Sequence, residues 1–220
     1  MAQLFPPAAD TVLRFAFVAA ALSIVVAALG GWGYARSSYV NQVGWVQDQP
    51  VPFSHKHHVA DDGIDCRYCH SSVETSAKAG LPSTHVCMTC HSQLWMGADA
   101  LAPVRESLAS GKPIRWHRVA QLPDYVYFNH SIHISRGVAC VECHGRIDQM
   151  PLTWRAKPFE MRFCLECHRD PAPHLRPLGK VTQMTPIDWS SKQQRAFAAQ
   201  AMHKHHIDPK LLDNCGLCHR

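Results

Sequence analysis

The architecture of this 220-residue chain follows from the pentapeptide Cys66-Arg67-Tyr68-Cys69-His70, which is the first of five copies of one pattern. In each copy, here numbered motif 1 to motif 5 in chain order, two residues separate two cysteines and a histidine follows the second. The cysteine pairs are Cys66 and Cys69, Cys87 and Cys90, Cys140 and Cys143, Cys164 and Cys167, and Cys215 and Cys218. The histidines are His70, His91, His144, His168 and His219. The copies use all 10 cysteines of the chain.

This pattern is the attachment site of c-type haem. Two thiols at that spacing add to the vinyl groups of one porphyrin, and the histidine becomes an axial ligand of the iron. Zinc sites also use paired cysteines, but two pairs complete one tetrahedral site, so five pairs leave one over and the histidines unexplained. Disulfides in such short loops constrain little, and a thioredoxin-like site would need a strand–helix–strand pattern that is not visible. The sequence therefore predicts five covalently attached c-type haems.

A second pattern, Phe-x-His-x-x-His, precedes two of the motifs. It occurs at residues 53–58, before motif 1, and at residues 128–133, before motif 3. Each copy is followed by two haem motifs, so the chain contains a duplicated two-haem module with an offset of about 75 residues. The sequence thus predicts an internal repeat that binds four of the five haems.

The repeated histidines are predicted to be the second axial ligands. Two histidines three residues apart project from the same side of a helical turn and can reach two different irons. We predict that His55 binds the iron on His70. By the same repeat, His130 binds the iron on His144. The second histidines of the two copies, which would bind neighbouring irons that the spacing does not identify, are His58 and His133.

The second ligand of the fifth iron stays open at the level of sequence. His203 lies twelve residues before Cys215 and follows a stretch at 191–201 that is rich in Ala and Gln and predicts a helix. A helix-borne histidine is one candidate. A methionine ligand, which would raise the reduction potential relative to a second histidine, is the other. The methionines that flank motif 4 are Met150 and Met161.

Four further histidines have no counterpart in the repeat. His57 breaks the spacing of its copy and is predicted to lie beside the ligands without binding iron. The three that the sequence leaves unassigned are His85, His117 and His174.

An uncharged stretch near the N-terminus is long enough to cross a membrane. Residues 15–34 would form a helix of about 30 Å, the thickness of the hydrocarbon core of a bilayer. The alternative is a cleaved signal peptide, but the apolar part of such peptides usually has only about 7–15 residues. Because c-type haem is attached outside the cytoplasm, we expect a single-pass protein of the plasma (inner) membrane with its haem domain on the periplasmic side.

These features predict the domain organisation. We expect a cytoplasmic segment at 1–14, the transmembrane helix at 15–34, a linker at 35–50 and a haem domain at 51–220. The haem domain would comprise modules at about 51–115 and 116–175 and a C-terminal part at 176–220 with the fifth haem. The 15 Pro and 12 Gly residues favour loops over long elements. The fold class is therefore mainly α with extensive loops, and the haems supply much of the interior.

The charge of the chain gives no support to a nucleic-acid partner. The formal net charge is +5. Each oxidised haem c adds about one negative charge, because its two ionised propionates outweigh the ferric porphyrin. Five haems therefore bring the protein close to neutral.

Three blocks of the sequence resemble the pentahaem cytochrome c subunit of bacterial alternative complex III. They are residues 53–70, residues 122–130 and residues 145–153. The apolar N-terminal stretch and the order of the five motifs match as well, so the resemblance covers nearly the whole chain. It is weakest around 171–208. One departure is Ala120, where the resemblance leads us to expect a histidine whose role is vacant here or passes to His117.

The resemblance implies a quinol-oxidising membrane complex. Its other members would be an iron–sulfur subunit, a monohaem cytochrome c and polytopic quinol-binding subunits. This chain would pass electrons to a downstream cytochrome c or a terminal oxidase, as an electron-transfer subunit rather than a stand-alone catalyst, and it would have no catalytic residues of its own.

Three other functions fit parts of the pattern. A membrane-anchored quinol dehydrogenase would itself oxidise quinol at a haem with an open or weakly ligated iron. A multihaem reductase of nitrite or a similar oxyanion would need an open iron, and all five motifs end in His rather than in the Lys of nitrite-reducing relatives. A scaffold without redox activity is the third alternative.

Overall fold

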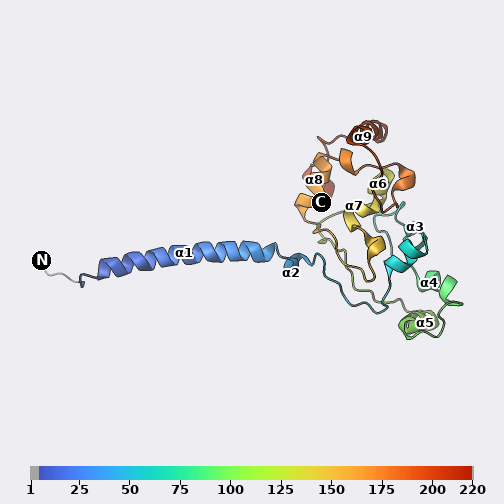
Figure 1. Cartoon of the computed structure of the whole chain (residues 1–220), viewed down its shortest axis with the longest axis horizontal. Coiled ribbons are helices and arrows are strands. Elements are labelled where there is room, and N and C mark those ends of the chain that lie inside the picture. The colour runs from blue at the N-terminus through green and yellow to red at the C-terminus, as the bar shows by residue number, and fades with distance from the viewer. Residues whose placement is uncertain (1–4, 220) are drawn as a thin grey trace. The chain divides into compact units, whose positions relative to one another are not determined.

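The computed structural model describes residues 5–219 of the chain. The chain divides into two compact units, Met1–Val43 and Gly44–Arg220. Each unit is described by itself. Helices are labelled as in Figure 1.

The first unit is built on one long apolar helix, α1 (Ala9–Ala35), followed by the short helix α2 (Ser38–Asn41). None of the side chains of α1 is buried within the chain. Its most apolar part has a mean hydropathy of 2.4, and it is the one helix in the described residues with the length and composition to cross a membrane. The predicted N-terminal apolar helix is therefore present. It begins earlier than residue 15 because the hydrogen-bonded backbone continues through the charged turn in which Arg14 pairs with Asp10 at 2.9 Å.

The second unit consists of short helices joined by long loops (Figure 1). The helices are α3 (Cys66–Cys69), α4 (Thr84–His91), α5 (Ala102–Ser110), α6 (His130–Ser135), α7 (Cys140–His144), α8 (Met161–Arg169), α9 (Ser191–His205) and α10 (Cys215–Cys218). A π-helical turn, η1, covers Lys56–Asp61. Within residues 5–219 there is no β-strand, and the isolated bridges join Val46 to Trp154 and Val138 to Leu175. The predicted mainly α-helical fold with extensive loops is confirmed.

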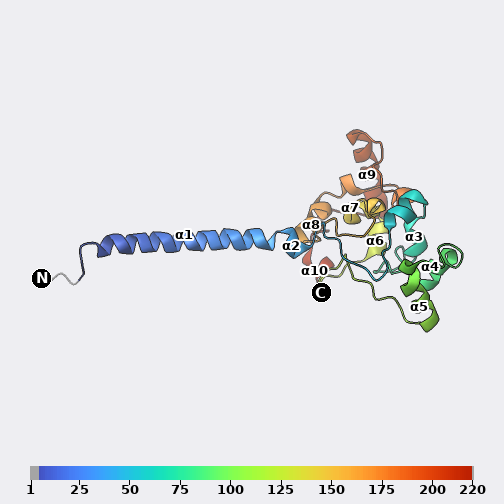
Figure 2. The same cartoon turned by 60° about the horizontal axis from the view of Figure 1, so that its bottom comes forward.

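The haem motifs form their own small helices. The cysteine pairs lie on α3, α4, α7, α8 and α10, which Figure 2 shows from a second direction. Two of these helices have a side-chain cap, because Asp65 accepts a hydrogen bond from the backbone of Arg67 and Asn214 accepts one from Gly216. A capped helical turn holds both thiols and the following histidine on one short rigid element.

The apolar core of the second unit is small. One cluster contains Val73, Ile134 and Val181, and another contains Leu175, Ala198 and Ala201. The residues that pack around α9 belong to the second cluster, and the predicted helix at 191–201 is present there with a capping box between Ser190 and Gln193. So little buried side-chain surface is unusual for a unit of this length. The interior instead contains a cavity that is lined by residues of the haem motifs.

Candidate haem-binding site

The cavity of the second unit has a volume of about 1220 Å³ and is lined by the predicted haem-binding residues. Nine of the 10 motif cysteines line it, Cys215 being the exception, and so do the histidines of motifs 1 to 4. All 10 cysteines are free thiols. Both copies of the Phe-x-His-x-x-His pattern contribute their histidines, which are His55, His58, His130 and His133. The residues predicted to tether and to ligate haem are therefore gathered around one space.

Three pairs of histidine rings face each other across this cavity at nearly the same separation. The ring centroids are 6.2 Å apart for His58 and His91 and 6.4 Å apart for His130 and His144. The third pair is His133 and His168, at 6.1 Å. Each pair joins one histidine of the repeated pattern to one motif histidine.

This separation is the one that an iron between two imidazoles requires. A metal–imidazole bond is about 2 Å long and the nitrogen lies about 1 Å from the ring centre, so two rings on opposite sides of one iron have centroids about 6 Å apart. The donor set also fits, because thiols, two imidazoles and an apolar cavity are what c-type haem needs. Within residues 5–219 no group of three or more His, Cys, Asp or Glu side chains is arranged to hold a metal ion, so a zinc site has no donor cluster there.

His55 lies close to the histidine of motif 1. Burial, followed by the nearby charges of His70, His58 and His144, lowers the pKa of His55 from 6.5 to about 4. The pKa of His144 is also lowered to about 4, chiefly by burial and then by His130 and His70. Both rings are thus neutral at physiological pH, and neutral imidazole is the form that binds a metal.

Most of these histidines are fixed through the nitrogen that would not face the iron. Their Nδ1 atoms lie 2.7–3.1 Å from backbone carbonyl oxygens. Because a carbonyl only accepts hydrogen bonds, Nδ1 carries the proton and Nε2 keeps its lone pair for a metal. The histidines and the residues whose carbonyls hold them are His58 and Ser54, His70 and Gly80, His91 and Leu94, His130 and Ala77, His133 and Asn129, His168 and Leu212, and His219 and Tyr125.

The two copies of the repeat have the same local geometry although their helices differ. In the first copy Phe53 stacks on His58 at 4.4 Å and meets His55 edge-on at 4.9 Å. In the second copy Phe128 lies 4.5 Å from the ring of His133 and 4.7 Å, edge-on, from that of His130. The first copy leads into η1 and the second into α6. The phenylalanine therefore fixes the relative orientation of two histidines that lie near different motif histidines.

The cysteines place the five motifs in a spatial order that differs from their order in the chain. The Cys66 thiol donates a hydrogen bond to Cys140, which raises the pKa of Cys66 and lowers that of Cys140. Burial raises the pKa of Cys69, with smaller contributions from the neighbouring cysteines of motif 2. Burial and then the cysteines of motif 4 raise the pKa of Cys143 to about 12. Burial and then Cys218 of motif 5 raise the pKa of Cys164. The attachment sites thus lie in the order 2, 1, 3, 4, 5.

The fifth motif is held by the segment that precedes α6. The backbone N–H of Tyr127 donates to the carbonyl of Cys218 at 2.8 Å, and the His219 ring lies on the carbonyl of Tyr125 at 3.1 Å. No repeated histidine pairs with His219 in the described residues.

The structure does not bring the three proposed ligands of the fifth iron to the cavity. Met150 is 1 % exposed and belongs to the protein core. Met161 is 67 % exposed at the start of α8. His203 is exposed on α9. The cavity lining includes none of the three.

His57 is not among the residues that line the cavity. It is exposed, lies 3.8 Å from a carboxylate oxygen of Asp61 and 3.5 Å from one of Asp62, and stacks on Trp95 at 6.2 Å.

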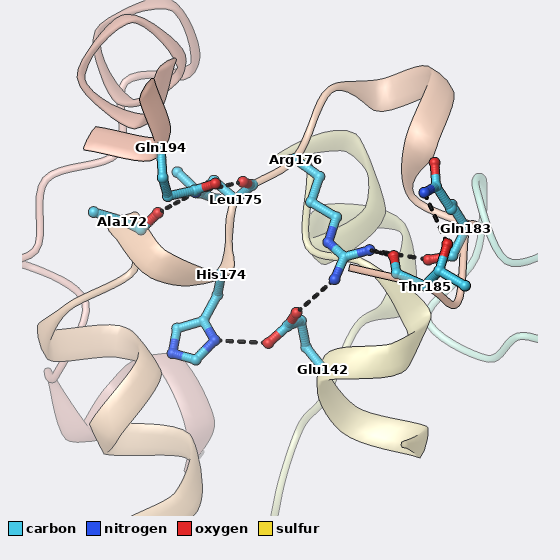
Figure 3. Close-up of polar contacts among 8 residues, drawn as sticks. All are labelled: Glu142, Ala172, His174, Leu175, Arg176, Gln183, Thr185 and Gln194. Carbon is cyan, nitrogen blue, oxygen red and sulfur yellow. Dashed lines mark hydrogen bonds and ion pairs between the residues drawn. The ribbon is translucent and has the colours of Figure 1, made fainter. Parts of the chain in front are cut away.

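Four histidines that sequence reasoning did not assign as ligands line the cavity, and they are His117, His174, His205 and His206. The Nδ1 atom of His174 lies 2.8 Å from Glu142, the third residue of motif 3, and Arg176 reaches the other carboxylate oxygen at 3.4 Å (Figure 3). The hydrogen bond that His174 donates to the Glu142 carboxylate raises the pKa of His174. Arg176 also donates to the carbonyls of Gln183 and Thr185, so this cluster ties α7 to the loop after α8. A spacing rule cannot find His117 or His174, because the residues that hold their rings, Asp48 and Glu142, are distant from them in the sequence.

Comparison with known proteins agrees with this geometry. The family model for cytochrome c3 matches residues 132–220. The chain is also 30% identical, over 203 residues, to the menaquinone reductase multihaem cytochrome c subunit of Nitratidesulfovibrio vulgaris. The alignment covers 90% of this chain and 86% of that subunit. Cysteine pairs followed by histidine, a cavity lined by both and a relative matched along nearly its whole length lead to one conclusion. The chain belongs to this family of multihaem cytochromes c, which bind haem covalently.

Proposed function

We propose that this chain is a membrane-anchored electron relay with five c-type haems, acting as a subunit of a quinone-reacting membrane complex. c-type haem supplies one-electron redox chemistry at a protein-tuned potential. The chain's own residues would tether the five porphyrins through the motif cysteines and hold their irons through the motif histidines. The apolar helix α1 would anchor the chain, with the haem domain on the periplasmic side.

The three facing histidine pairs carry this proposal. Each pair would occupy both axial positions of one iron, at ring separations of 6.1–6.4 Å. An iron with both positions filled has no place for a substrate, so these sites favour electron transfer over catalysis. The closeness of His55 to His70 supports the same arrangement in motif 1.

The order of the attachment sites supports a relay with two ends. Motif 2 and motif 5 lie at opposite ends of the order derived from the cysteines. We infer that one end serves the electron donor and the other the acceptor, with motifs 1, 3 and 4 between them.

We further propose that the complex is of the alternative complex III type. Its iron–sulfur subunit, monohaem cytochrome c and polytopic quinol-binding subunits would be the partners, and electrons would run from quinol towards a downstream cytochrome c or a terminal oxidase. The sequence blocks at 53–70, 122–130 and 145–153 support this assignment.

A second candidate is the opposite direction, in which the same relay delivers electrons for menaquinone reduction. The relative from Nitratidesulfovibrio vulgaris, matched over 90% of this chain, is named as a subunit of a menaquinone reductase.

The haem content tests the relay. The intact mass of the purified protein, together with its alkaline pyridine spectrum, should correspond to five attached haems per chain. Fewer than five would refute the proposal of a five-haem relay.

The direction of electron flow is tested on membranes that contain the whole complex. If the chain works in quinol oxidation, a menaquinol analogue reduces its haems and a reduced external cytochrome does not drive quinone reduction. The reverse result assigns the second candidate. The purified subunit alone should oxidise no quinol, and activity in that assay would favour a quinol dehydrogenase instead.

A further inference from the structure

The fifth iron would lack a second ligand if only the repeated histidines were available. His58, His130 and His133 face the motif histidines of motifs 2, 3 and 4, and His55 lies beside that of motif 1. His219 would therefore need a partner from outside the repeat.

Four further histidines line the cavity, and two of them share a second feature of the assigned ligands. His117 and His174 both line the cavity, and both have Nδ1 held by an oxygen, at 2.7 Å and 2.8 Å. The other two, His205 and His206 at the end of α9, have no hydrogen bond through Nδ1 within the described residues. The Nδ1 atom of His174 lies on Glu142 of motif 3. The iron of this motif would already have a facing histidine pair, His130 and His144. His117 is the one that remains.

His117 is exposed, and hydrogen bonds hold both its backbone and its ring. Its Nδ1 atom lies 2.7 Å from the carbonyl of Asp48, so the proton is on Nδ1 and Nε2 is free. The Gln49 side chain accepts from the backbone N–H of His117 at 3.0 Å and donates to its carbonyl at 2.9 Å. This bonding across 68 residues of chain holds both the backbone and the ring of His117. Fixing a ring through Nδ1 is how proteins orient a histidine towards a metal.

The segment that carries His117 also holds motif 5. The carbonyl of Tyr125 accepts from His219, and the N–H of Tyr127 donates to Cys218. Between them and His117, the Arg155 guanidinium donates to the carbonyls of Val119 and Gln121, both at 3.2 Å. The segment that begins at His117 is therefore held at Asp48 and Gln49 by His117, and at motif 5 by Tyr125 and Tyr127.

We propose that His117 is the second axial ligand of the iron held by His219. This inference rests on the proposed function, because it requires haem at motif 5. It replaces His203, Met150 and Met161 as the candidates for that position.

The test uses the full-length holoprotein and the variant His117→Ala. The wild type should be low-spin at every iron and should bind no carbon monoxide when reduced, since carbon monoxide needs an open ferrous position. The variant should show one high-spin haem per chain by electron paramagnetic resonance and bind one carbon monoxide per chain. His117→Met should restore a low-spin iron and raise the reduction potential of one haem.

Matched controls are His85→Ala, an exposed residue of α4 that does not line the cavity, and His174→Ala. Both should keep the wild-type spectrum. Low-spin irons and no carbon monoxide binding in His117→Ala would overturn the inference, as would a high-spin signal that appears in His174→Ala instead. The number of attached haems distinguishes a failure of the proposed function from a failure of the His117 assignment. A wild type without haem at motif 5 refutes the five-haem relay, whereas five haems with an unaffected His117→Ala refute this assignment alone.

Discussion

Three of the four repeated histidines, His58, His130 and His133, have Nδ1 at a backbone carbonyl, and their rings face the space where an iron would lie. For His130, Nδ1 lies 2.9 Å from the carbonyl of Ala77, and the ring is nearly parallel to that of His144, with the two centroids 6.4 Å apart. His130→Ala should therefore leave the iron of motif 3 with one protein ligand and convert one haem to the high-spin state. The visible and electron paramagnetic resonance spectra measure this.

His57→Ala is the matched control for that substitution, because His57 belongs to the other copy of the repeat but is exposed and lies near Asp61 and Asp62. It should leave all haems low-spin. If His130→Ala and His57→Ala gave the same spectrum as the wild type, the assignment of His130 would be wrong.

A single carboxylate at the start of α3 connects motif 1 to the loop after α8. The hydrogen bond from Arg67 lowers the pKa of Asp65 from 3.8 to about 2, although partial burial opposes the shift, and Thr182 adds a hydrogen bond at 2.9 Å. Because the folded pKa lies below the unfolded value, Asp65 contributes stability above pH 3.8 that is lost as the pH falls through about 2.

Asp65→Asn keeps an oxygen for the cap on Arg67 and removes the charge. We expect the wild type to have the higher urea midpoint at pH 5, and the difference between the two proteins to shrink as the pH falls to 2. Circular dichroism during urea unfolding measures it. A difference that stays constant over this range would show that the charge of Asp65 does not stabilise the fold.

At the scale of elements, the turn between α6 and α7 depends on a glycine. Gly137 has φ = +85°, and a Cβ at this position would collide with the backbone carbonyl oxygen of Arg176. That backbone pairs with the turn, because the N–H of Arg176 donates to the carbonyl of Gly137 at 2.8 Å. Gly137→Ala should lower the free energy of unfolding by about 1–3 kcal/mol, since neither the positive φ nor the close approach tolerates a side chain.

The thermal midpoint of the holoprotein measures this effect, and Gly179→Ala is its control. Gly179 has no atom within 4 Å of a built Cβ. The control should change the midpoint little or raise it slightly. Equal midpoints for the two variants would contradict a steric role for Gly137.

For the whole molecule, the division at Val43 separates an apolar anchor from a haem unit. We expect a protein in which a cleavable signal peptide replaces residues 1–43 to be soluble without detergent and to keep the visible spectrum of the full-length protein. The physical reason is that none of the side chains of α1 is buried within the chain, so the haem unit does not need them for packing. Fractionation after cell disruption tests this, with the full-length protein as the membrane-bound control. A truncated protein that still sediments with membranes in a host without the partner subunits would indicate a second membrane contact.

The sequence by itself determined the chemistry of this protein. The two cysteines and the histidine of each motif are neighbours in the chain. Their spacing therefore predicts covalent haem attachment without knowledge of where the motif lies in the fold. The repeat was also visible, because the copies at 53–58 and 128–133 keep the same spacing. The apolar stretch that became α1 needed only composition and length.

Only the tertiary structure showed which groups meet. That His58 faces His91, and His133 faces His168, depends on how separate helices pack, and spacing alone left both irons unnamed. The spatial order of the motifs likewise arises from the contact between Cys66 and Cys140, which are 74 positions apart in the chain. For the fifth iron the sequence pointed to residues near motifs 4 and 5, whereas our proposal names His117, whose ring is held by the carbonyl of Asp48. Local rules describe contacts within one turn, but a ligand supplied from a distant segment is set by the packing of the whole unit.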